Sequence, residues 1–407
     1  MAWMSRLPGS FPLYFTDAAG ARFTDVDGHT YVDFCLGDTG AMTGHGSTHL
    51  ADALSAQARR GITTMMPNDD APWVAGELAR RFGLPLWQMA MTATDANRFA
   101  LRFARQITGR SKVLVFDWCY HGTVDEALAT LDADGRVVAR PGAVGAAVDP
   151  ALTTKVVPFN DIDALAAALA PGDVACVLAE PALTNIGIVL PDPGFHAAMR
   201  SLCDRTGTLL VIDETHTICT GPGGATTAWD LRPDLFVIGK TIGGGMPAAA
   251  YGMTAEVAAR LAPVLASPDV DVSGVGGTLT GNALAVAAVR ATLSTALRDE
   301  DFATMIPMAE RWEAGVAKVI AEAGLPWHVQ RLGCRAEYWF CPPPRHGAAA
   351  AAAVDHELDA FMHLYALNRG ILLTPFHNMA LLSPHHDHAD VDLHTQVFAD
   401  AVTELTS

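Results

Sequence analysis

The chain has 407 residues and a formal net charge of −17 at pH 7, and half of its residues are hydrophobic. The acidic surplus and the lack of any Lys/Arg run argue against nucleic acid as a partner. No stretch of about 18 uncharged apolar residues occurs, which argues against a membrane span. The N-terminus has no charged start followed by a long apolar stretch, so we expect a cytoplasmic globular protein.

Seven cysteines are spread along the chain without CxxC or CxxxC spacing. An odd number without paired spacing predicts reduced, buried thiols rather than a disulfide framework or a metal site. We therefore expect no metal ion.

Short apolar runs separated by turn signals open the chain. FPLYF (11–15), ARFTDVDG (21–28) and HTYVDFCLG (29–37) alternate with turns such as DAAG (17–20), which predicts a small β-meander over residues 1–48. Residues 49–82 have a helical pattern.

From there to about residue 275, apolar strands alternate with loops and helices. The predicted strands are KVLVF (112–116), CVLAE (176–180), LLVIDE (209–214) and LFVIG (235–239). Helical periodicity is clear at 96–108 and 194–207. Buried strands alternating with helices predict an α/β fold with a mostly parallel, doubly covered sheet.

The tail differs from this pattern. It predicts a helix (302–323), a strand (334–340), an alanine-rich segment (347–353), a helix (355–368) and a last helix after residue 388. We expect a large domain over 49–298, and a smaller α+β domain that the meander 1–48 and the segment 299–407 form together.

Two strand ends carry candidate chemistry, because ligands bind beyond the carboxyl ends of strands in such sheets. Asp213 ends one apolar run, where a cation such as a protonated ring nitrogen would keep it charged. Lys240 follows another run and precedes three glycines, so its amine suits attack on an aldehyde. The simpler alternatives are a helix cap for Asp213 and a lysine that reaches out to solvent.

Two threonine-containing segments could bind a phosphate at the start of a helix. The first contains Thr92 and Thr94, and the second contains Thr278 and Thr280, although either is also compatible with a plain helix cap. Neither matches a Walker A or GxGxxG loop, which argues against ATP and NAD. Beyond residue 116, Tyr120 or Trp118 could stack on a planar cofactor or simply pack in the core.

Taken in order, these segments resemble one known family. TDVDGHTYVDF, TATDAN, FDWCYHG, AEPALTNIGIVLP, VIDETHT, DLFVIGKTIGGGMP and GGTLTGNALA are similar to segments of the class III (subgroup II) aminotransferases, pyridoxal-phosphate (PLP) enzymes of fold type I. Within this family the likeness is to glutamate-1-semialdehyde aminomutase and to the β-amino-acid and D-phenylglycine transaminases. The resemblance covers nearly the whole chain and implies PLP as cofactor.

The resemblance also implies roles for individual residues. Lys240 would hold PLP as a Schiff base and later move the substrate proton, and Asp213 would keep the pyridine nitrogen protonated. Tyr120 would stack on the ring. Further cofactor and pocket positions are Thr92, Ala93 and Thr94 at the phosphate, Thr278 at the phosphate of a neighbouring subunit, and Glu180 and Asn185 along the pocket. A homodimer with shared active sites follows from the role of Thr278.

Three positions depart from the family pattern. Ala93 replaces a usual glycine, Thr215 occupies the place of a valine under the ring, and DETHTICTGPGG replaces DEVxxGFR, which removes an arginine and brings His216 near the ring. The helix that precedes the first strand in the family is also missing, so we expect a late-starting or truncated N-terminus.

Candidates for holding a substrate carboxylate are Arg6, Arg335 and His377. Arg335 shares a strand face with Glu337, and a pairing of the two is the simpler explanation for that arginine. Four aromatic residues could line an apolar side pocket, or pack in the core: Trp3, Phe11, Trp118 and Phe376.

The expected function is an aminotransferase that moves an amino group between an amine or amino-acid donor and a keto acid or ketone by a ping-pong route. The first alternative is an intramolecular aminomutase with the same cofactor, which needs no second substrate. The second alternative is a PLP-fold binding protein without catalysis, against which the presence of both Lys240 and Asp213 argues.

Overall fold

A seven-stranded sheet forms the centre of the protein, whose computed structural model describes residues 12–145 and 148–407. Its strands lie in the order β4–β12–β11–β10–β9–β5–β8. Their bounds are β4 Leu86–Ala90, β12 Ala249–Met253, β11 Leu235–Ile238, β10 Leu209–Asp213, β9 Val174–Ala179, β5 Lys112–Phe116 and β8 Thr154–Val157. Paired strands run parallel from β11 to β8, whereas β12 is antiparallel to both of its neighbours.

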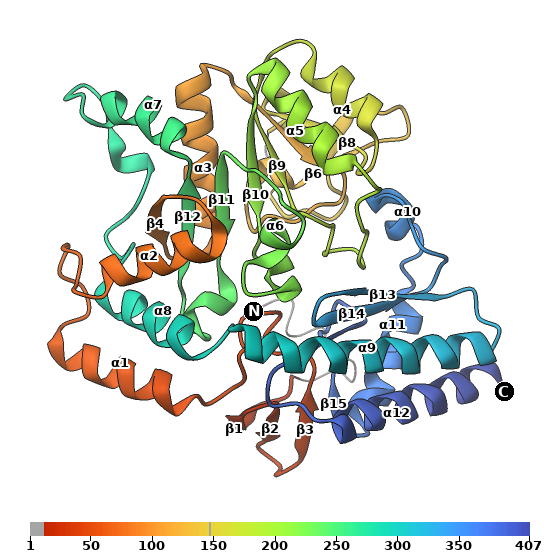
Figure 1. The fold of residues 1–407 in the computed structure, drawn as a ribbon. Helices are drawn as coiled ribbons and strands as arrows, with labels where there is room; N and C mark the ends of the chain where they lie inside the picture. The colour runs from red at the N-terminus through yellow and green to blue at the C-terminus, as the bar shows by residue number, and fades with distance from the viewer. Residues whose placement is uncertain (1–11, 146–147) are drawn as a thin grey trace.

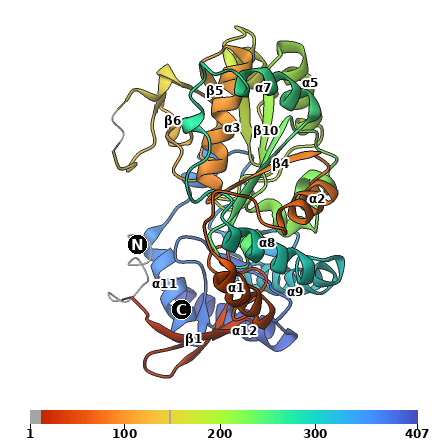
Figure 2. The ribbon, with the colours of Figure 1, turned by 90° about the vertical axis from the view of Figure 1, so that its left-hand side faces the viewer.

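Helices cover both faces of this sheet, as the sequence predicts. Helix α3 (Ala93–Thr108) packs against β9, β10, β11 and β12, while α5 (Phe195–Thr206) packs against β10 and α2 (Ala71–Phe82) against β4. Figure 2 shows the sheet between α3 on one side and α5 with α2 on the other. The remaining helices of this part are α4 Ile162–Leu169, α6 Gly224–Ala228, α7 Ala255–Leu265 and α8 Ala283–Thr295. Double coverage explains why β9, β10 and β11 are buried at every residue.

The N-terminal and C-terminal segments share a second, smaller region below the large sheet (Figure 1). The meander of β1 (Phe15–Ala19), β2 (Arg22–Asp25) and β3 (Thr30–Asp33) gains a fourth strand, because β15 (Ile371–Leu372) pairs in parallel with β3. A three-stranded antiparallel sheet lies nearby, made of β13 His328–Leu332, β14 Arg335–Trp339 and β16 Met379–Leu381. The helices of the C-terminal segment are α9 Asp299–Glu322, α10 Gly347–Ala351, α11 His356–Leu367 and α12 His388–Thr406.

The α/β fold with a mostly parallel, doubly covered sheet is confirmed, and so is the union of the meander with the C-terminal segment. The domain boundaries at residues 48 and 298 stay predictions. The predicted strand 112–116 coincides with β5, and the predicted helices 302–323 and 355–368 lie within three residues of α9 and α11.

Two local predictions were wrong. The helical pattern over 49–82 is two helices, α1 (Thr48–Arg60) and α2, because Gly61 ends the first and the residues from 61 to 69 are not helical. The turn predicted at DAAG lies mostly inside β1, which pairs with β2 and turns only at Gly20. Backbone pairing across the meander outweighs the low strand propensity of Asp and Ala there.

All seven cysteines are free, and six of them are buried, which confirms the prediction of buried thiols. Among the described residues, no helix has the length and apolar character needed to cross a membrane.

The turn between β13 and β14 ties the small sheet to the large region. Gly333 has a φ of 58°, and a Cβ placed on it would overlap the backbone carbonyl oxygen of Cys219, to which Cys334 donates its N–H. We expect Gly333→Ala to lower the free energy of unfolding by the left-handed cost of about 1–2 kcal/mol plus roughly 2 kcal/mol or more for the overlap. Urea unfolding followed by circular dichroism measures this loss.

Gly324→Ala is the matched control, because Gly324 has a φ of 63° but a Cβ there meets nothing within 4 Å. It should show the left-handed cost alone. Equal losses in the two variants would contradict the close approach at Gly333.

Candidate active site

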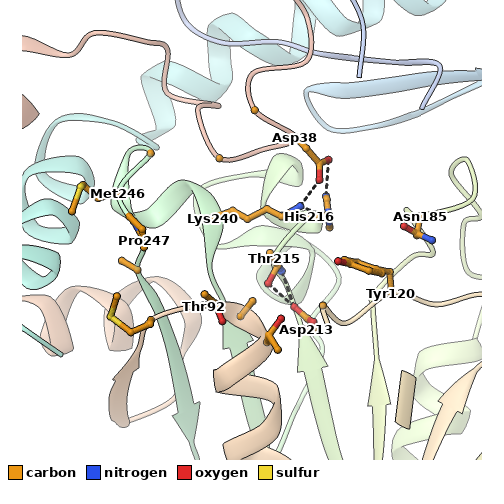
Figure 3. A pocket seen from close by; sticks show the side chains of 18 of the residues that line it. Asp38, Thr92, Tyr120, Asn185, Asp213, Thr215, His216, Lys240, Met246 and Pro247 are labelled. Atoms are coloured by element: carbon orange, nitrogen blue, oxygen red, sulfur yellow. Dashed lines mark hydrogen bonds and ion pairs between the residues drawn. The ribbon is translucent and has the colours of Figure 1, made fainter. Parts of the chain in front are cut away.

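A cavity of about 560 Å³ opens beyond the carboxyl ends of β10 and β11. Asp213 is level with Val237 in the pairing of these two strands, so Lys240, three residues later, emerges at the same edge of the sheet. The structure brings most of the predicted site residues to this cavity (Figure 3). They are Thr92, Ala93, Thr94, Tyr120, Asn185, Asp213, Thr215, His216, Lys240, Phe376 and His377.

Asp213 lies at the bottom of the cavity with its side chain buried. One oxygen, Oδ2, accepts a hydrogen bond from Asn97 at 2.8 Å and lies 2.9 Å from Nδ1 of His121. The other, Oδ1, accepts from the N–H and the hydroxyl of Thr215. Thr215 therefore orients the acid in this structure.

The pKa values of Asp213 and His121 shift so that both stay charged. Burial raises the pKa of Asp213, but the hydrogen bond and charge of His121, helped by Thr215 and Asn97, outweigh burial and lower it. Burial lowers the pKa of His121, but Cys119 and Asp213 outweigh burial and raise it to about 10. The result is a buried ion pair beneath the cavity.

Helix α3 begins at the wall of the cavity. Its N-cap is Thr92, whose hydroxyl accepts from the N–H of Asp95 and donates to the Asp95 carboxylate. Since that hydroxyl is committed to the cap, the N–H groups of Ala93 and Thr94 are better placed for an anion at the helix N-terminus. A Cβ on Gly122 would overlap the Thr94 hydroxyl, so a glycine is needed where this loop passes the helix.

Lys240 begins a short 3₁₀ helix, η5 (Lys240–Gly243), with a left-handed φ of 51°. This sparsely populated conformation aims its side chain into the cavity. Its Nζ lies 2.6 Å from Oδ2 of Asp38 and 2.8 Å from Nε2 of His216 (Figure 3). Burial raises the pKa of Asp38, but the charge and the hydrogen bond of Lys240 outweigh burial and hold the pKa far below its usual value.

A chain of polar contacts runs from the cavity into the small region. His216 lies 3.3 Å from Nη1 of Arg335, which is fully buried and donates to Glu337 and to the carbonyl of Thr184. Glu337 also lies 3.0 Å from Nδ1 of His377. Burial and the charge of Lys240 lower the pKa of His216 well below its ordinary value, so His216 is neutral.

Tyr120 lines the cavity beside Asp213, and Asn185 lies farther along the same side (Figure 3). Glu180 is not among the lining residues, because its carboxylate is used behind them. It accepts from the backbone N–H of Tyr120 and from both the N–H and the hydroxyl of Thr184. Glu180 therefore braces the loops that carry Tyr120 and Asn185.

Three other predicted residues also lie away from the cavity. Arg335 is turned to Glu337, which is the pairing that the sequence favours, and both side chains are fully buried. Trp118 lies under the guanidinium of Arg140, 5.6 Å from its ring centre. Thr278 is on the exterior, and Asn282, not Thr278 or Thr280, caps α8. Arg6, Trp3 and Phe11 lie outside the described residues.

Three residues of the site were not singled out from the sequence: Asp38, Asn97 and His121. His121 and Asn97 lie within segments that the family resemblance already covers. Their closeness in the sequence to Tyr120 and Thr94 could have identified them as site residues. Asp38 comes from the loop after β3, and no pattern in LGDTGAM connects it with Lys240, which lies 202 residues later.

The residues of the cavity fit pyridoxal phosphate. A helix N-terminus suits its phosphate, the ionised Asp213 suits its pyridinium nitrogen, and the amine of Lys240 suits its aldehyde. The cavity has the volume of a small-molecule site. Gly122 lets its loop pass close to the start of α3, and the ion pair with His121 keeps Asp213 ionised.

Comparison with known families and curated proteins gives concordant results. The family model described as aminotransferase class-III matches residues 4–314. A glutamate-1-semialdehyde 2,1-aminomutase of Desulfitobacterium hafniense is 32% identical over 402 residues, which cover 98% of this chain and 92% of that protein. A second such enzyme, from Bacillus cereus strain AH187, is 33% identical over 393 residues, or 94% and 89% of the two chains.

Solved structures include close matches. A glutamate-1-semialdehyde-aminomutase of Pseudomonas aeruginosa PAO1 is 51% identical with a TM-score of 0.97, covering all of this chain and 90% of that one. A lysine-to-alanine variant from the same organism was solved in complex with PMP. An omega-transaminase of Sphaerobacter thermophilus is 27% identical with a TM-score of 0.90, over 99% and 93% of the two chains. A beta-phenylalanine aminotransferase of Variovorax paradoxus is 28% identical, with a TM-score of 0.86 over 99% and 90%.

The ion pair at Asp213 makes a prediction about pH. We expect the wild type to lose folding stability as the pH rises from about 6.5 to 10. The loss should be smaller in His121→Gln. The folded pKa of His121, about 10, lies above its ordinary 6.5, so its stabilisation is fully present below pH 6.5 and is lost as pH rises through 10. Urea unfolding at a series of pH values measures the slope.

His196→Gln is the control, because burial lowers the pKa of His196 to about 4, and its linkage to stability lies below pH 6.5. This variant should keep the wild-type slope in the alkaline window. An unchanged slope in His121→Gln would show that His121 is not charged in the folded protein.

Proposed function

The chain belongs to the class III aminotransferase family, and from that membership we propose that it is an aminomutase, which moves an amino group within one substrate molecule. Its cofactor is pyridoxal 5′-phosphate. Glutamate-1-semialdehyde, for which several relatives are named, is the first substrate to test.

The observation that carries the proposal is that relatives of similar fold differ in their sequence identity to this chain. The aminomutase of Pseudomonas aeruginosa is 51% identical across the whole chain, whereas the two transaminases are 27% and 28% identical. The sequence alone favours a transaminase, with a mutase as the alternative. The comparisons support the alternative better.

The site supports the chemistry that both outcomes share. Bound pyridoxal phosphate supplies an aldehyde that condenses with amines and a ring that accepts the electron pair left when the neighbouring carbon loses a proton. Asp213, kept ionised by His121, would hold the positive charge of the ring nitrogen in place. Tyr120 would limit the ring on one side, and Ala93 and Thr94 would bind the phosphate through their N–H groups.

Lys240 would move the proton at the reacting carbon. Its Nζ has two partners within 2.8 Å, the neutral His216 and the ionised Asp38, which can take or return a proton and fix the direction of the amine. We assign Lys240 the role of general acid and base, and His216 a positioning role.

A second candidate function is a transaminase that exchanges amino groups between two substrates. The likeness to the omega-transaminase and the beta-phenylalanine aminotransferase favours it, since both cover 99% of this chain. The two functions differ in one requirement, because a transaminase needs a separate amino acceptor and an aminomutase does not.

We further propose a homodimer in which Thr278 reaches the phosphate of the neighbouring subunit. The support is an exposed apolar surface close to Thr278. Its residues Met65, Met66 and Leu279 are more than half exposed in the single chain, and Met65, Met66 and Thr278 line one shared hollow. Such side chains are typical of an interface between subunits.

The decisive assay incubates the holoenzyme with glutamate-1-semialdehyde and follows the rearranged amino acid by chromatography, with and without an added keto acid. We expect turnover at the same rate in both conditions, because the amino group returns to the molecule that supplied it. Lys240→Ala should lose at least about a hundredfold in rate, since proton transfer by a positioned group contributes about 10²–10⁴-fold.

Two results would contradict the proposal. Strict dependence on the keto acid would identify a transaminase instead. Full activity of Lys240→Ala would show that another amine performs the proton transfer.

A further inference from the structure

The loop after β3 brings one carboxylate to the wall of the cavity. Four consecutive residues, Leu36 to Thr39, have φ angles of 45°, 58°, 52° and 80°, and three of them are not glycine. A left-handed conformation is unfavourable for such residues and persists where the surroundings enforce it, often at functional sites. Figure 3 shows that this loop turns the side chain of Asp38 toward the amine of Lys240.

The carboxylate of Asp38 is directed at this amine. Oδ2 lies 2.6 Å from Nζ of Lys240, whereas Oδ1 is buried and has no hydrogen-bond partner among the described residues. The Asp38 side chain is only 16% exposed, so water screens its charge weakly. The negative charge of Asp38 therefore acts mainly on the nitrogen of Lys240.

The second neighbour of the amine does not balance its charge. Nε2 of His216 lies 2.8 Å from Nζ. Burial and the charge of Lys240 lower the pKa of His216 well below its ordinary value, so the ring is neutral and accepts a hydrogen bond from the amine. His216 can orient Nζ, but the charge opposite Nζ is that of Asp38.

Two further titratable groups face Asp38, and both are neutral. Burial raises the pKa of the Tyr120 phenol above its ordinary value. Burial also raises the pKa of the Cys35 thiol, to about 12. Both groups therefore keep their protons at neutral pH and add no charge beside the amine.

The charged groups around the cavity are already paired with one another. Arg335 and His377 both contact the buried carboxylate of Glu337. Asp213, at the bottom of the cavity, is paired with His121. Asp38 and Lys240 are therefore left to compensate each other.

We propose that Asp38 is a positioning residue whose carboxylate is the counter-ion of the Lys240 nitrogen, both when the amine is free and when it is joined to the cofactor. An opposite charge this close favours the protonated form of the nitrogen. Asp38 therefore sets the highest pH at which this nitrogen keeps its proton. The inference deepens the proposed function, and of that function it rests on the role of Lys240 alone.

The test is a pH titration of the holoenzyme without substrate. It follows the visible absorption of the bound cofactor, which changes when the nitrogen joined to it loses its proton. Asp38→Gly removes the carboxylate without a backbone cost, since glycine adopts a left-handed φ freely. We expect the midpoint pH to fall by at least about one unit, because an opposite charge within about 4–6 Å shifts a titration by about 1–3 units.

Asp38→Asn gives a second, independent measurement, because asparagine keeps the size of the side chain and tolerates a left-handed φ. It should lower the midpoint pH as Asp38→Gly does. Asp230→Gly is the matched control, since Asp230 also has a left-handed φ, 49°, but its side chain is 85% exposed and contacts Arg232. The control should keep the wild-type midpoint. Near-ultraviolet circular dichroism checks that each variant is folded.

Formate separates the effect of charge from that of packing. In Asp38→Gly, formate can occupy the space of the lost carboxylate, and it should move the midpoint pH back toward the wild-type value at constant ionic strength. Formamide has a similar size but no charge, so it should leave the midpoint unchanged.

Equal midpoints in the wild type and in either Asp38 variant would overturn the proposal. Formamide acting as well as formate would overturn it too, because a neutral group would then be sufficient. Failure of the proposed function has a different signature. A pH-dependent change in absorption that persists in Lys240→Ala would show that another amine joins the cofactor, whereas strict dependence of turnover on a keto acid would identify a transaminase and leave the role of Asp38 standing.

Discussion

Asp213 and His121 form an ion pair that is buried at the tip of β10, and the arrangement of the cavity depends on it. Removing one partner of such a pair typically costs about 3–5 kcal/mol, because the other charge is left without compensation. Asn97 and Thr215 complete the hydrogen bonds of the carboxylate, so the acid stays ionised although it is out of water. A fixed negative charge at this point would favour a cationic ring nitrogen. His121 comes from the loop that carries Tyr120, so the same contact fixes the position of that aromatic ring.

The register of the sheet and the packing of the small region then set the rest of the site. Parallel pairing of β10 with β11 places Lys240 at the same edge as Asp213, and α3 begins at that edge too. The loop that carries Asp38 follows β3, and β3 pairs with β15, so the C-terminal segment helps to hold Asp38 in front of Lys240. Arg335 and Glu337 extend the contacts of His216 into β14. The cavity therefore depends on residues from both ends of the chain.

Local patterns in the sequence are sufficient to predict β10, which ends at Asp213, and β11, which precedes Lys240. A fully buried strand is a continuous apolar run, and both strands show one. Local patterns do not reveal which side chains contact Asp213 and Lys240, because the contacting residues are distant in the sequence. Asp38 and Lys240 are 202 residues apart, and His121 and Asp213 are 92 apart. The family resemblance directs attention to Tyr120 and Thr92 but implies direct pocket roles for Glu180, which instead braces two loops. Arg335 is explained by the spacing to Glu337 on one strand face, a relation that the sequence does contain.

We infer that a buried, ionised Asp213 keeps the ring nitrogen of the cofactor protonated. Nitrogen-15 NMR of the protein loaded with cofactor labelled at the pyridine nitrogen reports this protonation state directly. We expect the chemical shift of a protonated ring nitrogen in the wild type at neutral pH, and that of an unprotonated ring nitrogen in Asp213→Asn. A wild-type shift typical of the unprotonated ring would contradict it.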